Sequence, residues 1–441
     1  MDLRARRVVV YGLGASGRAA ARLCVERGAD VVGVDRDPGV APIPGATLAL
    51  GPERAETFAT ADLVVVSPGI PPSAAPVRAA VAAGVEVIGE IALAHRCVGL
   101  PVAGITGTNG KSTTTHFAGQ LCEAAGLKPF VGGNLGRAYA EAGFAENAGR
   151  YELAVLELSS YQLEWCDELA PRVGAVLNLT PDHLARHGDL LAYGRAKCRM
   201  FARCGPEDLA AVPADDAPLV ALAAEQPGAR VWIGAHPGVV RDGADVQIAL
   251  PDGRRARFDL SGFQVPGEHN RDNVAVAAMF AVALGGDAAL VQAEIPRLLA
   301  LPHRMQVVAE RAGVTWIDDS KATNVAATLT GLRGLPDRRG VLLLGGEAKT
   351  GDDFRALAPH LAPWRVLTFG GSGAEIARAL EDVGIGVDRR GGLADAVGRA
   401  ASLVDVGETV LLSPGCASFD EFRNFEHRGE VFAALAREAS R

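Results

Sequence analysis

Residues 104–115 read Gly-Ile-Thr-Gly-Thr-Asn-Gly-Lys-Ser-Thr-Thr-Thr, an apolar run that ends in a glycine-rich turn followed by Lys-Ser. This pattern predicts a buried strand, a loop that holds nucleotide phosphates, and a helix whose N-terminal dipole faces the phosphates. Gly107 and Gly110 let backbone N–H groups close around an anion. Lys111 can reach the terminal phosphates, and the Ser112 hydroxyl is placed to bind Mg²⁺.

The loop departs from the standard Walker A pattern, which has a glycine six residues before its lysine. This chain has Ile105 at that position. An alternative interpretation is therefore a glycine turn that caps a buried strand and binds nothing. The Gly-Lys-Ser-Thr run at 110–113 favours the phosphate loop, and we expect ATP to be the nucleotide.

A second glycine turn follows the strand pattern at 7–11. Gly12, Gly14 and Gly17, with Asp35 at the end of the next strand pattern, have the spacing of a dinucleotide-binding fold. By itself this segment favours NAD as much as any other nucleotide, so an NAD-dependent oxidoreductase is one alternative. That alternative leaves the phosphate loop without a role, and the fold does not say which nucleotide it binds.

The chain has 441 residues, which is too long for a single hydrophobic core. We expect an α/β protein of three domains. Residues 1–94 form a Rossmann-like domain, 95–300 a central P-loop-type ATPase domain, and 301–441 a second Rossmann-like domain. Alternating residues on both sides of a Pro-Asp-Gly turn at 251–253 predict a hairpin, and hence a small β subregion, in the central domain.

Composition excludes several classes of protein. A net charge of −8 without a long basic run argues against nucleic acid as a partner. We find no apolar stretch long enough to cross a bilayer and no signal-peptide pattern, so we expect no membrane insertion. The 7 cysteines include no Cys-x-x-Cys pair. These features predict a cytoplasmic enzyme.

Polar groups follow two further apolar strand patterns. Glu157 lies late in the run at 151–160, and Asp182 and His183 come just after the run at 173–180. Carboxyl ends of parallel strands share one edge of a sheet, so we expect these groups near the phosphate loop. The alternatives are a hydrogen-bonded edge carboxylate for Glu157 and an ordinary loop histidine for His183.

Together these pieces resemble the Mur ligase family, and the likeness covers essentially the whole chain. The motifs that carry it are Gly-Thr-Asn-Gly-Lys-Ser-Thr (107–113), Gly-Gly-Asn-Leu-Gly (132–136), Leu-Glu-Leu-Ser-Ser-Tyr-Gln-Leu-Glu (156–164), Asn-Leu-Thr-Pro-Asp-His-Leu (178–184), Tyr-Gly-Arg-Ala-Lys (193–197), Gly-Glu-His-Asn-Arg-Asp-Asn (267–273), Leu-Pro-His-Arg (301–304), Asp-Asp-Ser-Lys-Ala-Thr-Asn (318–324) and Leu-Leu-Ser-Pro-Gly-Cys-Ala-Ser-Phe-Asp-Glu-Phe-Arg-Asn-Phe-Glu-His-Arg-Gly (411–429). The last of these segments is most similar to the member that adds D-glutamate.

The resemblance implies a reaction in peptidoglycan precursor synthesis, and so a part in cell-wall formation, cell shape and cell division. ATP phosphorylates a substrate carboxylate, an amino group attacks the acyl phosphate, and phosphate leaves as the amide forms. The implied substrates are UDP-N-acetylmuramoyl-L-alanine and glutamate. The first glycine turn then binds UDP, and we expect the enzyme to be a monomer.

The resemblance also implies the site residues. The implied catalytic residues are Lys111, Glu157, His183 and Lys197. The implied ATP-binding residues are Gly107, Thr108, Asn109, Gly110, Lys111, Ser112, Thr113, Asn270, Asn273, Arg304 and Asp319. The implied substrate-binding residues are Ser16, Asp35, Gly69, Asn134, Ser159 and Gln162 for the sugar nucleotide, and Lys321, Thr323, Lys349, Ser418 and Phe425 for glutamate.

Two Mg²⁺ ions are implied, one held by Ser112 and Glu157 and the other by His183 and Lys197. A lysine ammonium would repel the second ion, whereas a carbamate formed from lysine and CO₂ supplies the hard oxygen ligand that Mg²⁺ prefers. The chain has only five lysines among 44 basic residues, at 111, 128, 197, 321 and 349. A lysine retained in such a chain indicates chemistry that arginine cannot supply. The alternative is an ordinary lysine on a helix surface.

Three other functions stay open from the sequence alone. A sister ligase would share the fold and take a different amino acid, including L-glutamate, or a folate-type substrate. An NAD-dependent oxidoreductase would bind nicotinamide. An ATP-driven binding protein would hydrolyse ATP and form no amide.

Overall fold

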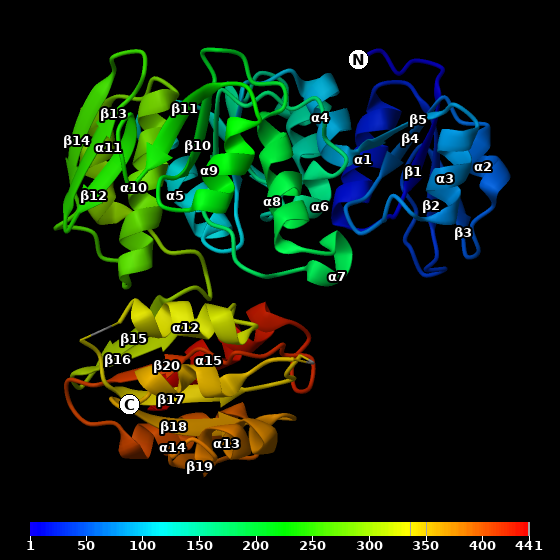
Figure 1. The fold of residues 1–441 in the computed structure, drawn as a ribbon. Helices are drawn as coiled ribbons and strands as arrows, with labels where there is room; N and C mark the ends of the chain where they lie inside the picture. The colour runs from blue at the N-terminus through cyan, green and yellow to red at the C-terminus, as the bar shows by residue number, and fades with distance from the viewer. Residues whose placement is uncertain (336, 350, 440–441) are drawn as a thin grey trace. The chain divides into compact units, whose positions relative to one another are not determined.

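The computed structural model describes residues 1–335, 337–349 and 351–439, and these residues form three sheets flanked by helices (Figure 1). Contacts divide the chain into two compact units. The first comprises Met1–Gly262 and Asn273–Pro296, and the second comprises Phe263–Asp272 and the chain from Arg297 onward. The division into three domains at 94 and 300 stays a prediction.

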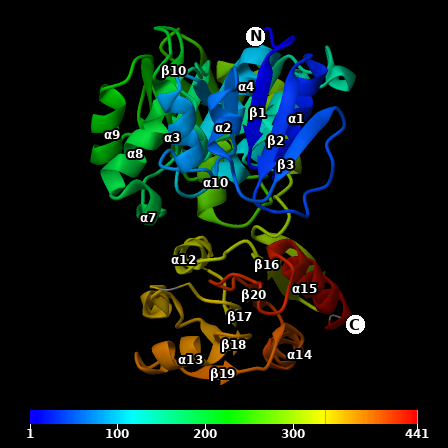
Figure 2. The same cartoon turned by 90° about the vertical axis from the view of Figure 1, so that its right-hand side faces the viewer.

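The N-terminal sheet is entirely parallel, with strand order β3-β2-β1-β4-β5. Its strands are β1 (Arg7–Tyr11), β2 (Asp30–Asp35), β3 (Ala46–Leu50), β4 (Leu63–Val66) and β5 (Glu86–Gly89). Its helices are α1 (Ala15–Glu26), α2 (Ala55–Ala59), α3 (Ala75–Ala82) and α4 (Glu90–Val98). Figure 2 shows β1, β2 and β3 beside α1.

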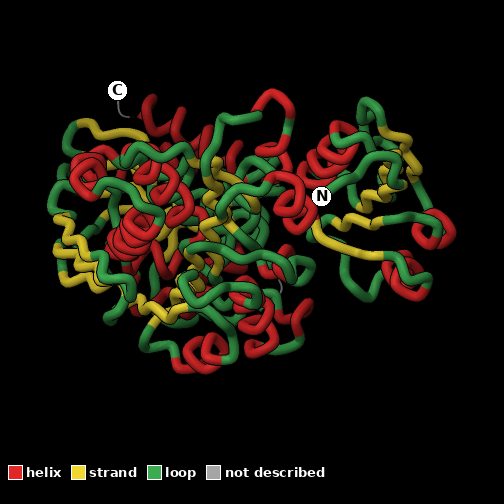
Figure 3. Tube along the Cα trace, turned by 90° about the horizontal axis from the view of Figure 1, so that it is seen from above, coloured by secondary structure: helices red, strands yellow, loops and turns green. Residues whose placement is uncertain are grey.

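Both faces of this sheet are buried because side chains alternate along each strand. Val8 and Val10 of β1 join a hydrophobic cluster that includes residues of α1 and α4. Val9 and Tyr11 of the same strand join a second cluster with Phe58 of α2 and residues of α3. Helices therefore lie on both sides of the strands, as the tube view shows (Figure 3). This layering explains why β1 is apolar at every position from 8 to 10.

The turn after β1 is the predicted glycine turn, and its geometry requires glycine. Gly12 has φ +87°, and a Cβ at Gly17 would lie 1.8 Å from the Gly12 carbonyl oxygen. The same carbonyl accepts a hydrogen bond of 2.7 Å from the Ser67 hydroxyl. The turn thus brings the start of α1 close to the end of β1, as a nucleotide-binding turn does.

The central sheet has nine strands in the order β14-β13-β12-β11-β10-β9-β6-β8-β7. Its strands are β6 (Val102–Thr106), β7 (Pro129–Gly133), β8 (Leu153–Glu157), β9 (Val173–Val176), β10 (Leu209–Pro213), β11 (Ala229–Ile233), β12 (Gly238–Asp242), β13 (Asp245–Ala249) and β14 (Arg255–Asp259). The strands from β6 to β12 pair in parallel with one another. Strand β13 pairs antiparallel with both β12 and β14. The predicted hairpin at the Pro-Asp-Gly turn is confirmed as β13 and β14.

Seven α-helices follow in this part of the chain: α5 (Lys111–Ala124), α6 (Ser160–Leu163), α7 (Leu184–His187), α8 (Leu190–Cys198), α9 (Ala217–Ala224), α10 (Glu268–Ala283) and α11 (Ala288–Glu294). Four short 3₁₀ helices join them: η1 (Tyr139–Gly143), η2 (Ala145–Asn147), η3 (Arg199–Phe201) and η4 (Ile295–Arg297). The alanine-rich run that begins at Asn273 lies in α10, whose first residue is Glu268.

The C-terminal sheet has the order β15-β16-β20-β17-β18-β19, with β15 antiparallel to β16 and the other pairs parallel. Its strands are β15 (Gln306–Arg311), β16 (Val314–Asp318), β17 (Gly340–Gly345), β18 (Trp364–Phe369), β19 (Val387–Arg389) and β20 (Thr409–Leu412). Its helices are α12 (Val325–Arg333), η5 (Phe354–His360), α13 (Gly373–Glu381), α14 (Leu393–Leu403) and α15 (Phe425–Ala439).

A buried arginine ties together the loops at the carboxyl ends of these strands. Arg428 of α15 is 0% exposed, and burial lowers the pKa of its guanidinium to about 10. Its Nη2 donates to the carbonyls of Ser320 (2.8 Å) and Cys416 (3.0 Å). Its Nη1 donates to the carbonyls of Gly345 (3.4 Å) and Ala417 (3.2 Å). One side chain therefore holds the ends of β16, β17 and β20.

We expect Arg428→Met to lower the free energy of unfolding of the second unit by at least about 3 kcal/mol, because several buried carbonyls lose their donor. Thermal unfolding should show this as a loss of about 10 °C. Arg437→Met, at an exposed position of the same helix, is the matched control and should unfold as the wild type does. An Arg428→Met protein of wild-type stability would contradict this role.

Among the described residues, no helix is both apolar enough and long enough to pass through a bilayer. All 7 cysteines are free thiols, and six of them are buried.

Candidate active site

The predicted phosphate loop connects β6 to α5. Gly107 has φ +145° and Gly110 has φ +81°, values that favour glycine. A Cβ at Gly107 would lie 3.1 Å from Leu177 Cβ, and a Cβ at Gly110 would lie 2.8 Å from Asn273 Oδ1. The backbone of this loop is therefore closely packed against Leu177 and Asn273. Helix α5 begins at Lys111, with its N-terminal N–H groups at the loop.

Asn178, which follows β9, supports the loop from the neighbouring strand. Its Oδ1 accepts from the backbone N–H groups of Thr108 (3.1 Å) and Asn109 (2.8 Å), and its Nδ2 donates to the Asn109 carbonyl at 3.0 Å. Lys111 Nζ donates to the Thr108 carbonyl at 2.8 Å. The loop is thus preformed, with its lysine already directed toward it.

Glu157 ends β8, next to the phosphate-loop strand in the sheet. Its side chain is 2% exposed, and its Oε1 accepts from Asn134 Nδ2 at 2.7 Å. Its Oε2 is buried without a hydrogen-bond partner. A buried carboxylate oxygen in this state has unused capacity for a cation or a hydrogen-bond donor.

Lys197 of α8 also reaches the phosphate loop. Its side chain is 1% exposed, and Nζ donates to the Gly107 carbonyl at 2.7 Å. Nζ also lies 4.1 Å from the centre of the Tyr193 ring. Burial, reinforced by the charge of Lys111, lowers the pKa of Lys197 to about 6. The alternative of an ordinary surface lysine is therefore wrong.

His183 lies at the start of α7, with φ +53°. Its backbone N–H donates to Asp182 Oδ1 at 2.8 Å, and its Nδ1 lies 3.2 Å from the Tyr161 hydroxyl. The ring of Tyr193 is 6.2 Å from the His183 ring, centre to centre, and also contacts Lys197. His183 and Lys197 are thus linked through one aromatic side chain.

In the part of the chain that the structure describes, no three or more His, Cys, Asp or Glu side chains gather as a metal site. A cation held by Glu157 would need further ligands of another kind. A serine hydroxyl, phosphate oxygens and a carbamate are such ligands.

The predicted sugar-nucleotide residues occupy the ends of strands in the first unit. Asp35 ends β2, and its Oδ2 accepts from the Leu13 backbone N–H at 2.6 Å. Ser16 lies in the first turn of α1. A side chain at Gly69 would meet no atom within 4 Å, so the chain leaves space there.

Asn134, Ser159 and Gln162 lie around the end of β8. Asn134 contacts Glu157 as described above, and Ser159 caps α6, where its Oγ accepts from the Gln162 N–H at 3.2 Å. Asn273 of α10 also reaches the first turn of α5, where the Thr114 hydroxyl donates to its Oδ1 at 3.1 Å. The first unit thus gathers these predicted residues at the carboxyl edges of its sheets.

The second unit carries the other predicted ATP residues. Asp319, 8% exposed, accepts from the Ser413 hydroxyl at 2.8 Å, and burial raises the pKa of Asp319 to about 7. The positive charge of Arg304 opposes that rise. Asn270 Nδ2 donates to the Pro266 carbonyl at 2.5 Å.

The predicted glutamate residues follow the strands that Arg428 ties together. Lys321 Nζ lies 3.8 Å from the centre of the Phe425 ring. Ser418 is 2% exposed and directly follows Ala417, which forms an isolated β-bridge with Glu347. Glu347 lies two residues before Lys349. The Thr323 N–H donates to the Lys321 carbonyl at 2.8 Å. The Lys349 side chain is exposed.

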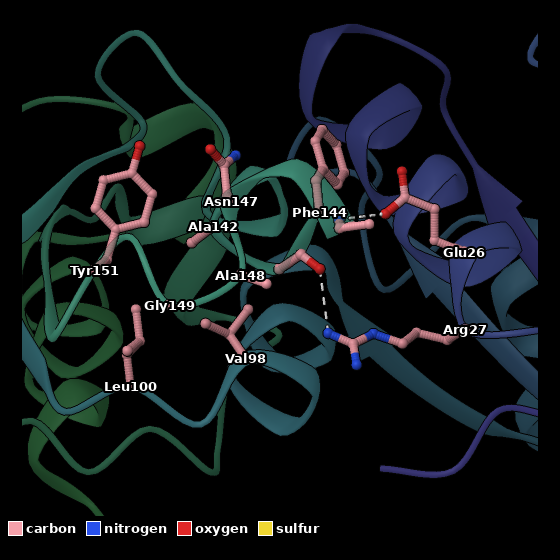
Figure 4. Close-up of a pocket in the computed structure, with 12 residues that line it drawn as sticks. Glu26, Arg27, Val98, Leu100, Ala142, Phe144, Asn147, Ala148, Gly149 and Tyr151 are labelled. Atoms are coloured by element: carbon pink, nitrogen blue, oxygen red, sulfur yellow. Dashed lines mark hydrogen bonds between the residues drawn. The ribbon is translucent and has the colours of Figure 1, made fainter.

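A cavity of about 280 Å³ lies apart from these groups, between α1 and residues 142–151 (Figure 4). Arg27 Nη2 donates to the Gly143 carbonyl at 3.1 Å, and the Ala145 N–H donates to Glu26 Oε2 at 2.9 Å. No predicted site residue is among those that line it. These contacts join α1 to the central part of the unit.

Family models match most of the chain. The model of the Mur ligase MurD-like N-terminal domain matches residues 6–89, that of the Mur ligase middle domain matches 105–281, and that of the Mur ligase glutamate ligase domain matches 303–416. The UDP-N-acetylmuramoylalanine--D-glutamate ligase of Myxococcus xanthus (strain DK1622) is 42% identical, over 99% of both chains. The chain belongs to the Mur ligase family.

Another relative with the same name, from Anaeromyxobacter dehalogenans (strain 2CP-C), is 42% identical to this Mur ligase over 100% of the chain and 99% of its own length. Solved structures are similar in fold. MurF ligase from Thermotoga maritima, in complex with ADP, has TM-score 0.60 and 17% identity over 100% of this chain and 96% of its own. The MurC ligase of the same organism has TM-score 0.58 and 17% identity, over 98% of this chain and 100% of its own.

The prediction of a Mur ligase with three α/β parts is confirmed, and so is the prediction of an ATP-dependent ligase that forms amide bonds. The oxidoreductase and binding-protein alternatives are therefore wrong. At 17% identity the solved structures support the fold alone. The individual site residues stay predictions.

The predictions omitted one residue that this Mur ligase places at its phosphate loop. Asn178 holds two backbone N–H groups and one carbonyl of that loop. A polar residue directly after an apolar strand was the available signal in the sequence. Its partners depend on which strands are neighbours, and the sequence does not give the strand order.

Proposed function

We propose that this Mur ligase joins D-glutamate to UDP-N-acetylmuramoyl-L-alanine, with ATP as the energy source, in peptidoglycan precursor synthesis. The observation that carries the proposal is the 42% identity, over 99% of both chains, to a relative with that name. The phosphate loop, the glycine turn after β1 and the polar strand ends of the second unit supply one site for each of the three substrates.

The reaction has two steps. An oxygen of the alanine carboxylate attacks the γ-phosphorus of ATP, the bond to the β-phosphate oxygen breaks, and ADP leaves. The amino nitrogen of glutamate then attacks the acyl carbon and loses a proton as phosphate leaves with the oxygen that bridged carbon and phosphorus. Both steps bring several negative charges together, so catalysis depends on positioning and on charge compensation.

The phosphate loop supports the first step. Its backbone N–H groups and the N-terminus of α5 are directed at the place where phosphates would lie. Lys111 is the cation for the terminal phosphates, and Asn178 holds the loop open in the required conformation. Thr108, Asn109, Thr113 and Asn273 complete the ATP-binding residues of the first unit. Asn270, Arg304 and Asp319, which belong to the second unit, are the other ATP-binding residues that the family resemblance implies.

The residues present fit Mg²⁺, because Glu157 has a buried carboxylate oxygen without a partner. Ser112 and Glu157 would hold one ion, and His183 and Lys197 a second. Bound Mg²⁺ supplies positive charge that offsets the charge of phosphate and carboxylate oxygens.

Lys197 would serve as a carbamate. Its lowered pKa favours the neutral amine that CO₂ requires, and its burial protects the product from water. A carbamate nitrogen keeps one hydrogen, so the bond to the Gly107 carbonyl can persist. The modification therefore fits the contacts of this side chain.

Asp35→Ala should raise the KM for the sugar nucleotide at least about tenfold, because one charged hydrogen bond to the ligand is lost. The KM for ATP should stay within about twofold, since Asp35 lies at the end of β2, beside the glycine turn after β1, and not at the phosphate loop. Steady-state kinetics with each substrate varied in turn measures both values. Equal increases in the two KM values would contradict a role in binding UDP.

Lys349→Ala should raise the KM for glutamate by about tenfold to a hundredfold, because a carboxylate would lose a charged partner. ATP binding should not change. Arg355→Ala, at an exposed position nearby that pairs with Asp353, is the control. An unchanged glutamate KM and rate would remove Lys349 from the site.

We infer a cytoplasmic monomer. The seven free cysteines support a reducing compartment. Sedimentation of the purified protein tests the monomer.

The test of function is a comparison of amino acids. The protein is incubated with ATP, Mg²⁺, UDP-N-acetylmuramoyl-L-alanine and D-glutamate, L-glutamate or L-alanine in turn, and the amide product is detected by mass spectrometry. We expect product with D-glutamate only. Product with another amino acid would identify a sister ligase, and ATP hydrolysis without product would refute the ligase proposal.

A further inference from the structure

A buried series of hydrogen bonds joins Glu90 to Ser159. Glu90 is the first residue of α4 and is 2% exposed, and Gln162 of α6 is 3% exposed. Gln162 Nε2 donates to Glu90 Oε1 at 3.0 Å. At the other end of the amide, Gln162 Oε1 accepts from the Ser159 backbone N–H at 2.9 Å and from the Ser159 hydroxyl at 3.0 Å.

Both ends of the Gln162 amide are therefore held. The oxygen end faces two donors of Ser159, and the nitrogen end faces the carboxylate of Glu90, which only accepts when ionised. Without Glu90, the amide nitrogen of Gln162 would be a buried donor with no acceptor. The orientation of the Gln162 side chain toward Ser159 would then be less stable. The Ser159 hydroxyl hydrogen is committed to Gln162, and one lone pair is used by the Gln162 backbone N–H. Its second lone pair is then the acceptor that it can offer to a ligand.

Glu90 is buried at a position where an apolar side chain would not incur the free-energy cost of removing a carboxyl group from water. Burial raises the pKa of its carboxyl group to about 7, and hydrogen bonds from Gln162 and from the backbone N–H groups of Glu90 and Ile91 oppose that rise. Because burial of a carboxyl group costs free energy, packing alone does not explain Glu90 at this position, and a functional role is indicated. Gln162 lies 72 positions after Glu90 in the sequence, so the contact joins two separate strand ends.

We propose that Glu90 is a positioning residue for the sugar-nucleotide site: it fixes Gln162, and through Gln162 it fixes the hydroxyl of Ser159 for the substrate. The inference rests on the proposed function, which places Ser159 and Gln162 at the sugar nucleotide. Glu90 itself touches neither substrate nor ATP in this scheme. Its effect should therefore appear in the binding of one substrate only.

Two variants separate the hydrogen bond from the packing. Glu90→Gln keeps a carbonyl oxygen for Gln162 Nε2, whereas Glu90→Met keeps the length of the side chain without a strong acceptor. We expect Glu90→Met to raise the KM for UDP-N-acetylmuramoyl-L-alanine about tenfold. The KM for ATP should stay within about twofold in both variants, and Glu90→Gln should stay within about threefold of the wild type for the sugar nucleotide.

A double-mutant cycle with Ser159→Ala tests the path of the effect. If Glu90 acts through the Ser159 hydroxyl, Glu90→Met should add little once Ser159 is alanine. A merely structural role would lower thermal stability and multiply the KM by the same factor in both backgrounds. Glu90→Ala takes the place of Glu90→Met in the cycle if the methionine variant does not fold.

Independent effects in the cycle, or a Glu90→Gln protein as impaired as Glu90→Met, would overturn the positioning role while the wild type still forms the amide. A wild-type protein that forms no amide would refute the proposed function, and with it the role of Glu90 at the sugar nucleotide. The two failures are therefore distinguishable in one set of assays.

Discussion

Lys197→Arg is expected to lower the kcat for amide formation by at least about 10²- to 10³-fold, while ATP still binds. Arginine keeps the positive charge and the approximate length of lysine, but its guanidinium does not lose a proton and cannot form the carbamate. Lys197 is a residue that is 1% exposed, and the substitution would replace its amine by a larger cation beside the Gly107 carbonyl. Turnover and ATP binding by titration measure the two effects separately.

Lys128→Arg is the matched control, because Lys128 is an exposed lysine paired with Glu152 at the surface. It should turn over as the wild type does. A carbon-13 NMR spectrum in labelled bicarbonate gives a second readout, in which the wild type should show a carbamate signal that Lys197→Arg lacks. Near-normal turnover of Lys197→Arg, or the same NMR spectrum for both proteins, would contradict the carbamate.

Glu157→Gln is expected to reduce kcat by at least about 10²- to 10³-fold with little loss of thermal stability. Glutamine keeps an oxygen for the bond from Asn134 Nδ2 and has nearly the same shape. It replaces the buried Oε2, which has no partner, by an amide nitrogen that cannot bind a cation. Turnover across a series of Mg²⁺ concentrations is the measurement.

Glu152→Gln, which removes the carboxylate of the same surface pair as Lys128→Arg, is the control and should be fully active. The Mg²⁺ concentration for half-maximal turnover should rise in Glu157→Gln and stay unchanged in Glu152→Gln. Wild-type kcat and Mg²⁺ dependence in Glu157→Gln would remove Glu157 from the metal site.

Elements with strong local signals could be predicted from the sequence. The turns at Gly12 and Gly110 need positive φ, which marks them as glycine turns between an apolar strand and a helix. The hairpin of β13 and β14 has a Pro-Asp-Gly turn. The edge strand β15, which pairs antiparallel to β16, gives a weak signal in the sequence, because its apolar run is only Val307-Val308-Ala309. The first residues of α10, Glu268-His-Asn-Arg-Asp-Asn, give no helix signal in the sequence, since they have no apolar periodicity.

Site residues on motifs could be placed on the correct edge of a sheet, but their partners could not. The unpaired oxygen of Glu157, the support of the loop by Asn178 and the contact of Glu90 with Gln162 all join segments that are distant in sequence. Such contacts depend on strand order and on register, which short-range patterns do not encode. The burial of Lys197, which lowers its pKa to about 6, likewise follows from packing and not from its neighbours in the chain.

This Mur ligase is expected to activate a carboxylate as an acyl phosphate before glutamate attacks. The most direct measurement uses UDP-N-acetylmuramoyl-L-alanine with oxygen-18 in both carboxylate oxygens, together with ATP, Mg²⁺ and D-glutamate. Mass spectrometry of the phosphate then follows the label. The proposed mechanism predicts one oxygen-18 in the released phosphate for each amide formed. Released phosphate without the label, alongside amide product, would contradict it.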